Sequence, residues 1–382
     1  MFIQYTIFFT LSLLISILLS KLIIQLLIKF DITRRSSRNI NATEKDGKPI
    51  MGGLIFIIPT VIVSLFANYI LPEGRFVYDS SIGILQNVSN FFGAGVIKIP
   101  ILVFLLAAIL GGVDDLLNLF GTDRAILKLS RVLKLITVHK SIFERVKLAI
   151  LFPWHAYKNF FFILGSNPGK GVQAHEKILV QVVIGTIIAW WIYGYMGISG
   201  VTIPFLGAIS LGLLMYPFTI LTVMTMANAV NITDGVDGLS SGLSIITLTG
   251  FFIVAIVKRN SPIAVLISIL LGGLVVYFYY NKKPAKVEMG DTGSLALGVI
   301  ITAIALALNQ AFLLVPFCLM FLIEFASSFI QGLGRRFLGR RIFKMAPLHH
   351  HFEMLGWREE RIVRAFLFVG VLGVFLGLIW VI

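Results

Sequence analysis

The sequence has little charge and almost no cysteine. Only 13% of its 382 residues are Asp, Glu, Lys or Arg, whereas 58% are hydrophobic; a typical soluble domain has about 25% charged and about 45–50% apolar residues. A chain with so few polar side chains cannot cover a soluble globule, which excludes an ordinary cytosolic enzyme and a disordered chain. The single cysteine, Cys318, excludes an internal disulfide framework and a cysteine metal site.

Acidic residues are scarce in particular. There are 18 Asp and Glu against 32 Lys and Arg, which gives a net charge of +14. In a soluble protein this excess would suggest a nucleic acid partner. In a membrane protein, basic residues instead concentrate in loops that face the cytoplasm and its anionic lipids. We therefore expect a membrane protein that binds no nucleic acid.

Long hydrophobic runs are what the sequence has in abundance. A spanning helix needs about 20 mostly apolar residues. Ten segments fit, near residues 5–28, 51–71, 96–115, 178–196, 204–227, 239–257, 262–280, 294–308, 311–332 and 363–381. They predict an all-α polytopic membrane protein of about ten transmembrane helices, folded as a single domain over residues 1–382.

The basic residues predict the orientation of these helices. Alternate loops cover residues 29–50, 116–177, 228–238, 281–293 and 333–362. With Arg364 at the edge of the last loop, they hold 27 of the 32 Lys and Arg. Because loops rich in Lys and Arg stay in the cytoplasm, we expect these five loops on the cytoplasmic side and both termini outside.

One of these loops contains a long insertion at about 119–168. It mixes Lys and Arg with Leu, Ile, Phe and Trp, and residues 148–164 are nearly apolar enough for an eleventh span. Pro153, His155 and Lys158 interrupt that stretch. We therefore interpret the insertion as a basic amphipathic cytoplasmic segment on the membrane surface, with an eleventh span as the alternative.

Two polar clusters follow predicted spans on the cytoplasmic side. Asp114 and Asp115 end the third span, where adjacent carboxylates suit a cation-bridged phosphate or a general base, or simply a solvated helix end. The second cluster is a short loop without Lys or Arg that contains Asn228, Asn231, Asp234 and Asp237. Its amides and carboxylates suit recognition of a base or sugar, although Asp237 could instead cap the next helix.

Two further clusters lie on the same predicted side. Gly-Asp291-Thr-Gly-Ser opens a helix, where backbone N–H groups favour phosphate and Asp291 could hold a divalent cation, or act as a plain cap. His349, His350 and His351 lie in an arginine-rich loop. Three consecutive histidines cannot all ligate one metal with good geometry, so phosphate or sugar recognition is favoured over a zinc site or a plain polar loop.

The four clusters together indicate a site for a nucleotide-activated substrate, with a lipid as the second substrate because the site lies at a membrane. A transporter is the rival class. Transporter sites usually lie near the middle of the bilayer on broken helices, whereas these acidic residues gather at helix ends on one side.

The order of the motifs resembles one enzyme family. The motifs are Pro49-x-Met-Gly-Gly, Gly-Gly-Val-Asp114-Asp115, Asn228-x-x-Asn231-x-Thr-Asp234-Gly-x-Asp237-Gly, Gly290-Asp291-Thr-Gly-Ser, Glu324-x-x-Ser-x-x-x-Gln331 and Ala-Pro-Leu-His349-His-His-Phe-Glu353. They are similar to those of the phospho-N-acetylmuramoyl-pentapeptide transferases (translocase I, MraY), over nearly the whole chain except about 119–168. The aspartate motifs alone would also fit the wider superfamily of polyprenyl-phosphate N-acetylhexosamine-1-phosphate transferases, such as the WecA type.

The resemblance implies an Mg²⁺-dependent enzyme of peptidoglycan synthesis in the bacterial inner (cytoplasmic) membrane. Its substrates would be UDP-MurNAc-pentapeptide and undecaprenyl phosphate, its products lipid I and UMP, and its active site would face the cytoplasm. A WecA-like transferase for a different UDP-sugar and an inactive or transport-related relative stay open as alternatives. The oligomeric state, including a homodimer, also stays open.

The resemblance also implies roles for single residues. Asp291 would bind Mg²⁺, Asp114 and Asp115 would hold or deprotonate the lipid phosphate or assist at the metal, and His349 and His350 would take part in catalysis. Substrate-binding residues would be Lys45, Lys170, Asn228, Asn231, Asp234, Asp237, Asn281, Gln331 and His351. The sequence departs from the family pattern at Lys48, Ile50, Asn118 and Glu288, and its Lys170-Gly-Val is displaced by the insertion.

Overall fold

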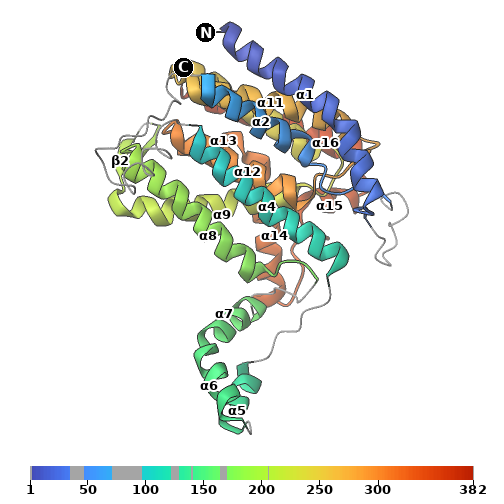
Figure 1. Ribbon diagram of the computed structural model, residues 1–382, viewed down its shortest axis with the longest axis vertical. Helices are drawn as coiled ribbons and strands as arrows, with labels where there is room; N and C mark the ends of the chain where they lie inside the picture. Colours follow the sequence, from blue (N-terminus) through green and yellow to red (C-terminus); the bar gives the residue numbers. More distant parts are fainter. Residues whose placement is uncertain are drawn as a thin grey trace.

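The computed structural model describes residues 2–34, 47–70, 97–121, 129–138, 141–163, 170–204 and 206–381. Over these residues the chain is a bundle of apolar helices (Figure 1). Within the described residues, eight helices are long and apolar enough to cross a membrane, a bent pair forms a ninth candidate, and a shorter apolar helix is the tenth segment. The predicted all-α polytopic fold is confirmed.

The helices of the bundle correspond to the ten predicted spans. They are α1 (Phe2–Lys29), α2 (Leu54–Ile70), α4 (Lys98–Phe120), α8 (Ala174–Ala189) with a π-helical extension (Trp190–Tyr195), α9 (Met215–Thr233), α10 (Leu239–Val257), α11 (Ser261–Asn281), α12 (Gly290–Ala307), α13 (Leu314–Phe317) with α14 (Leu319–Phe337), and α16 (Glu359–Ile379). Short 3₁₀ turns at Gly212–Leu214 and Ala311–Leu313 precede α9 and α13, and α15 (Leu348–Glu353) precedes α16.

Two predicted spans had wrong boundaries. The span expected at 204–227 begins only near Gly212, because β1 (Gly200–Ile203) and β2 (Gly207–Ser210) form an antiparallel hairpin before it. A short apolar run does not by itself distinguish a strand from a helix, which explains the error. The span expected at 311–332 is broken at Cys318, where α13 and α14 meet at an angle of 81°.

Helix α12 is the centre of the bundle and packs against α4 and α9. Every residue from Thr292 to Ala307 is buried. Small residues permit this close packing: a Cβ atom on Gly298 would lie 2.5 Å from Ala227 Cα, and one on Gly111 would lie 2.1 Å from the Asp291 carbonyl oxygen. Gly111 thus allows the last turns of α4 to pack against the beginning of α12.

The insertion forms an arm outside the bundle. It contains α5 (Leu129–Val138), α6 (Ile142–Ile150) and α7 (Phe152–Ile163), which project from the end of the bundle near the start of α8 (Figure 1). These helices are too short to cross a membrane. The arm contacts α8 where the Tyr157 hydroxyl donates to the His175 carbonyl at 3.0 Å and Trp154 packs edge-on against the His175 ring. Its position on a membrane surface stays a prediction.

The chain leaves for the arm and returns from it at one place. A Cβ on Gly121 would lie 3.0 Å from the Lys170 carbonyl oxygen, and one on Gly171 would lie 2.4 Å from Asn118 Oδ1. The segment after the insertion therefore packs directly on the end of α4, as it would without an insertion. Lys170-Gly171-Val172 is displaced in the sequence but lies beside Asp114.

Candidate active site

Asp114 lies at the centre of a polar cluster at the end of α4, where it is only 2% exposed. Its carboxylate accepts hydrogen bonds from the Asn118 side-chain amide at 3.1 Å and from the Val172 backbone N–H. The same carboxylate lies 2.8 Å from Lys177 Nζ. Asn118, where the family resemblance predicts a lysine, thus helps to hold Asp114, and a lysine from α8 supplies the positive charge.

Lys177 joins two of the sequence motifs. Its ammonium group lies 2.8 Å from Asp114 Oδ2 and 2.6 Å from Asp291 Oδ2, so it bridges the end of α4 and the beginning of α12. Asn231 completes the arrangement by donating to Asp291 Oδ1 at 2.8 Å. We refer to Asp114, Lys177, Asn231 and Asp291 as the carboxylate–lysine cluster.

Sequence reasoning missed Lys177. It fell at the end of the predicted cytoplasmic loop 116–177, where it was one of ten basic residues and belonged to no motif. A lysine within a membrane span is nevertheless costly and therefore marks a functional candidate. The signal that could have found it was its position in the first turn of a span, seven residues after Lys170.

Asp115 has different surroundings from its neighbour Asp114. It is 6% exposed and accepts hydrogen bonds from the backbone N–H groups of Asp291 and Thr292, each at 3.0 Å, and from the Thr292 hydroxyl at 2.6 Å. Asp115 therefore neutralises the positive end of α12 and fixes the backbone that carries Asp291. The two neighbouring aspartates thus have different roles: Asp114 faces Lys177, and Asp115 holds the beginning of α12.

The last turns of α9 and the loop after it bring their polar residues to this same end; Asn228 and Asn231, expected in a loop at 228–238, lie on the helix, which runs to Thr233. Asn231 donates to Asp291 and also to the Ser294 hydroxyl at 2.9 Å. Asn228, one turn earlier, donates to Gln181 of α8 at 3.1 Å and to the Met224 carbonyl. Asp234 follows at the end of α9 and is half-buried. Asn231 is thus the member of the carboxylate–lysine cluster that α9 supplies.

Asp237 is held by a residue that departs from the family pattern. Lys48 Nζ lies 3.2 Å from Asp237 Oδ2, and the Ala285 backbone N–H donates to the same oxygen at 3.2 Å. Helix α10 is preceded by Gly238 in the left-handed region, with φ of 82° and no side-chain cap. The N-cap residue of α10 is therefore Gly238 and not Asp237. Lys48 supplies the positive charge that the loop around Asp237 lacks.

Asn281 and Gln331 use their side-chain amides within the protein. Asn281 is 4% exposed, accepts from Gly238 N and the Ser241 hydroxyl, and donates to the Val287 carbonyl. Gln331 is 3% exposed and holds the backbone of Ile342 and Phe343. Both residues fix the loops that form the site, and a direct contact with substrate stays a prediction.

The histidine loop meets the other motifs through His349. Its backbone N–H donates to Glu324 Oε1 at 3.0 Å, and its Nδ1 lies 2.9 Å from Glu324 Oε2, with both side chains almost fully buried. An ionised carboxylate can only accept, so Nδ1 donates in this contact when Glu324 is ionised. Among the described residues Nε2 has no hydrogen-bond partner, and it faces Gly235, where an added Cβ would meet it.

The other two histidines lie closer to the surface. His350 Nδ1 is 2.7 Å from Glu353 Oε2, and His351 Nδ1 accepts from the Lys344 backbone N–H at 3.2 Å. Their different partners confirm that the three rings do not converge on one position. The loop thus supplies one buried histidine oriented by a carboxylate and two on its outer side.

The remaining residues singled out from the sequence lie outside the contacts described above. The Lys170 side chain is exposed beside the carboxylate–lysine cluster. Glu288, where an aromatic residue was expected, lies 2.8 Å from Arg34. Lys45 lies outside the described residues.

The donor set fits a divalent cation such as Mg²⁺. Asp114 and Asp291 point their carboxylate oxygens at one positive group, Lys177 Nζ. No three His, Cys, Asp or Glu side chains in the described part of the chain form a closed metal cage. Mg²⁺ prefers hard oxygen ligands and typically takes one or two carboxylates and substrate phosphates rather than a closed protein cage. Asp291 and Asp114 match that pattern.

Comparisons with known proteins place these residues in context. Residues 169–309, which include Lys177, Asn231 and Asp291, match the model of glycosyl transferase family 4. A phospho-N-acetylmuramoyl-pentapeptide-transferase from Caldanaerobacter subterraneus is 30% identical over 87% of this chain and 84% of its own length. Enzymes of the same name from Desulforamulus reducens and Clostridium perfringens are 41% and 37% identical, over 55% and 54% of this chain and 64% and 66% of theirs.

Proposed function

Since the chain belongs to the phospho-N-acetylmuramoyl-pentapeptide-transferase family, we propose that it transfers phospho-MurNAc-pentapeptide from UDP-MurNAc-pentapeptide to undecaprenyl phosphate. The products are lipid I and UMP. The observation that carries this proposal is the carboxylate–lysine cluster, which gathers acidic, basic and amide groups from α4, α8, α9 and α12 at one end of a membrane bundle.

The cluster suits a reaction between two anions. An oxygen of the lipid phosphate attacks the phosphorus next to the sugar, the bond from that phosphorus to the bridging oxygen breaks, and UMP leaves with that oxygen. Two phosphates repel one another as they approach, so positive groups fixed before the reaction lower the barrier. Lys177 is such a group: its ammonium lies 2.8 Å from Asp114 and 2.6 Å from Asp291, and it would stay beside these carboxylates when they hold a metal ion.

Mg²⁺ is the proposed cofactor, and when bound it would screen the phosphate charges and polarise their oxygens. Asp291 would hold it, with Asp114 as the second carboxylate. Asp115 would act indirectly, because its oxygens accept from the beginning of α12 and so orient Asp291. Asp114 would hold or deprotonate the lipid phosphate. The ammonium of Lys177 lies beside Asp114 and would balance part of the negative charge there.

The nucleoside side of the site is proposed to involve the segment from Asn228 to Asp237, which covers the end of α9 and the loop after it, and the histidine loop. They meet where Gly235 lies against His349, whose Nε2 has no hydrogen-bond partner among the described residues. An imidazole nitrogen held in this way by Glu324 is oriented to accept or donate a single hydrogen bond to substrate. Glu288 has no aromatic ring and is paired to Arg34 at 2.8 Å. We therefore do not expect the uracil to stack on the side chain at position 288.

We propose that the site faces the cytoplasm of a bacterial inner membrane. The loops that carry the motifs also carry most of the Lys and Arg, and such loops stay in the cytoplasm. In this orientation the site would face the compartment in which a soluble UDP-sugar is made, and both termini would lie on the opposite side.

The proposal is tested by offering the purified chain competing sugar nucleotides with polyprenyl phosphate. UDP-MurNAc-pentapeptide is expected to be converted, and UDP-N-acetylglucosamine to remain, as measured by labelled sugar in the lipid fraction. Conversion of UDP-N-acetylglucosamine alone would favour the WecA-like alternative. No lipid-linked product with any of them would favour an inactive or transport-related relative.

A further inference from the structure

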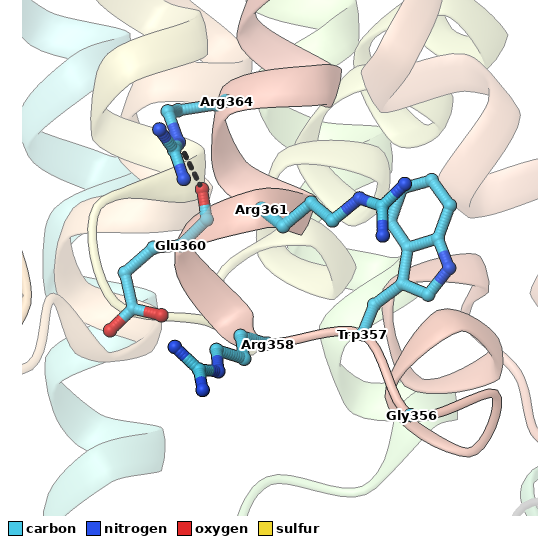
Figure 2. Close-up of a pocket in the computed structure, with 6 residues that line it drawn as sticks. All are labelled: Gly356, Trp357, Arg358, Glu360, Arg361 and Arg364. Carbon is cyan, nitrogen blue, oxygen red and sulfur yellow. Dashed lines mark hydrogen bonds between the residues drawn. The ribbon is translucent and has the colours of Figure 1, made fainter.

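A pocket rich in arginine lies at the beginning of α16. Its volume is about 530 Å³. The residues that line it, drawn in Figure 2, are Gly356, Trp357, Arg358, Glu360, Arg361 and Arg364. We refer to it as the arginine pocket. It is separate from the carboxylate–lysine cluster and shares no residue with it.

The acidic residues beside the pocket are matched to a lysine, not to the arginines. Lys283 Nζ lies 2.9 Å from Glu359 Oε2 and 3.8 Å from Glu360 Oε1. In the part of the chain that the structure describes, no carboxylate forms an ion pair with Arg358, Arg361 or Arg364. With three arginines and one carboxylate, Glu360, in its lining, the pocket carries a net positive charge.

Two arginines are held by the protein in ways that leave guanidinium N–H groups available. The Arg361 guanidinium lies 4.1 Å from the centre of the Trp357 ring, and stacking of this kind leaves its edge free to donate. Arg364 donates from Nε to the Glu360 carbonyl at 3.2 Å (Figure 2). Both side chains are thus oriented before any ligand arrives.

The spacing of the arginines fits the headgroup layer of a bilayer. Positions 358, 361 and 364 follow at intervals of three residues, so the first and last Cα atoms are about 9 Å apart along the helix. The polar layer on each side of a bilayer is about 5–8 Å thick. Long arginine side chains at these three positions can therefore all reach the layer that holds the lipid phosphates.

The surface beyond the arginines is apolar and exposed. Phe368, Val371 and Phe375 follow Arg364 at intervals of four, three and four residues, so they continue its helical face. They are 63%, 50% and 62% exposed. Phosphate-binding groups at the end of a span, followed by an exposed apolar stripe, match a molecule with an anionic headgroup and acyl chains rather than a free anion.

We propose that the arginine pocket binds the phosphate headgroup of an acidic phospholipid, whose acyl chains lie along the exposed face of α16. Arg358, Arg361 and Arg364 supply the positive charge that attracts the phosphate, and Trp357 keeps the Arg361 guanidinium flat against the pocket wall.

The test compares two double variants that lose the same charge. Arg361→Gln with Arg364→Gln alters the pocket, whereas Arg335→Gln with Arg336→Gln removes two basic residues from the last turn of α14 that do not line it. Each protein, in neutral detergent, is titrated with phosphatidylglycerol or with phosphatidylcholine of the same chains, and the unfolding temperature is followed.

Phosphatidylglycerol should raise the unfolding temperature of the parent and of the α14 variant alike. In the pocket variant its apparent affinity should fall by about fivefold for each arginine removed. Equal affinity in all three proteins would refute the proposal. Stabilisation of the parent by millimolar inorganic phosphate to the same extent would instead assign the pocket to a free anion and would also overturn the lipid assignment.

A second measurement does not depend on the folding of the arginine variants. Brominated phosphatidylglycerol should quench tryptophan fluorescence more than brominated phosphatidylcholine does, because the lipid is held beside Trp357. The extra quenching should disappear in Trp357→Phe. If it persists in that variant, the acidic lipid binds elsewhere and the proposal is wrong.

Discussion

Replacing Lys177 with glutamine removes the charge that links α4, α8 and α12 while keeping a side chain of similar reach. In the protein its ammonium lies 2.8 Å from Asp114 and 2.6 Å from Asp291. Removing one partner of a buried ion pair costs about 3–5 kcal/mol, since the remaining charges are left buried and unpaired. Because the Lys177 and Asp291 side chains are 21% and 24% exposed, solvent screens part of this, and we expect a loss of about 2 kcal/mol in the free energy of unfolding.

The same substitution should increase the response to Mg²⁺. Two carboxylates that have lost their cation offer a divalent ion the oxygen ligands it prefers, without competition from an ammonium group. A ligand at a hundred times its dissociation constant stabilises the folded state by about 2.7 kcal/mol, so saturating Mg²⁺ should restore about the whole loss. The measurement is the unfolding temperature of the purified protein over a Mg²⁺ titration, without substrate.

Lys48→Gln is the matched control. It also removes one lysine from an ion pair, but Lys48 contacts the single carboxylate of Asp237. Its stability should therefore not recover with Mg²⁺. Equal responses to Mg²⁺ in the parent, Lys48→Gln and Lys177→Gln would show that the carboxylate–lysine cluster is no divalent-cation site, and the reasoning would fail.

Four further expectations concern the site, the arm and the orientation. Asp291→Asn should leave a folded protein, since Asn can still accept a hydrogen bond, but lower turnover by roughly two or more orders of magnitude, the scale of losing one electrostatic stabiliser; near-normal turnover would remove Asp291 from the site. Glu324→Gln replaces the acceptor at His349 Nδ1 with an amide that can turn its N–H toward it, so turnover should fall by roughly tenfold or more with little change in KM; equal kinetics would show that the orientation of this ring is unimportant. Deleting about 40 residues between Gly121 and Pro168 should keep activity in detergent within about tenfold, because the arm lies outside the bundle, and should weaken use of the lipid substrate in anionic bilayers; a folded deletion protein without product would place part of the site in the arm. A cysteine at position 38 or 340 should resist an impermeant thiol reagent on intact cells, and labelling at either position would reverse the predicted orientation.

The sequence predicted the membrane helices well because each is a local property. A span needs only its own run of apolar residues, and the segment predicted at 239–257 has those same ends in the structure as α10. The hairpin at Gly200–Ser210 was missed because its residues are also apolar, and the break at Cys318 because neither segment beside it is unusual in composition. Hydropathy reports burial in lipid, not the local geometry of the backbone.

The partners of the site residues could not be predicted from local patterns. Motif order indicated that Asp114, Asn231 and Asp291 belong together, and the structure brings them into one cluster with Lys177. Lys177 is separated from Asp291 by 114 residues, and Lys48 from Asp237 by 189. Such contacts depend on how the helices pack, which no run of neighbouring residues encodes. Similarly, only packing against α12 distinguishes Asp115 from Asp114.

The central claim is that this site joins a sugar phosphate to a lipid phosphate, and release of UMP tests it most directly. Purified protein is incubated with UDP-MurNAc-pentapeptide and polyprenyl phosphate, and UMP and lipid-linked sugar are counted in the same reaction, with Mg²⁺ and with a chelator. We expect one UMP for each lipid-linked product, formed only when Mg²⁺ and both substrates are present. Release of UMP without lipid-linked product, or no release with every component present, would contradict the proposed function.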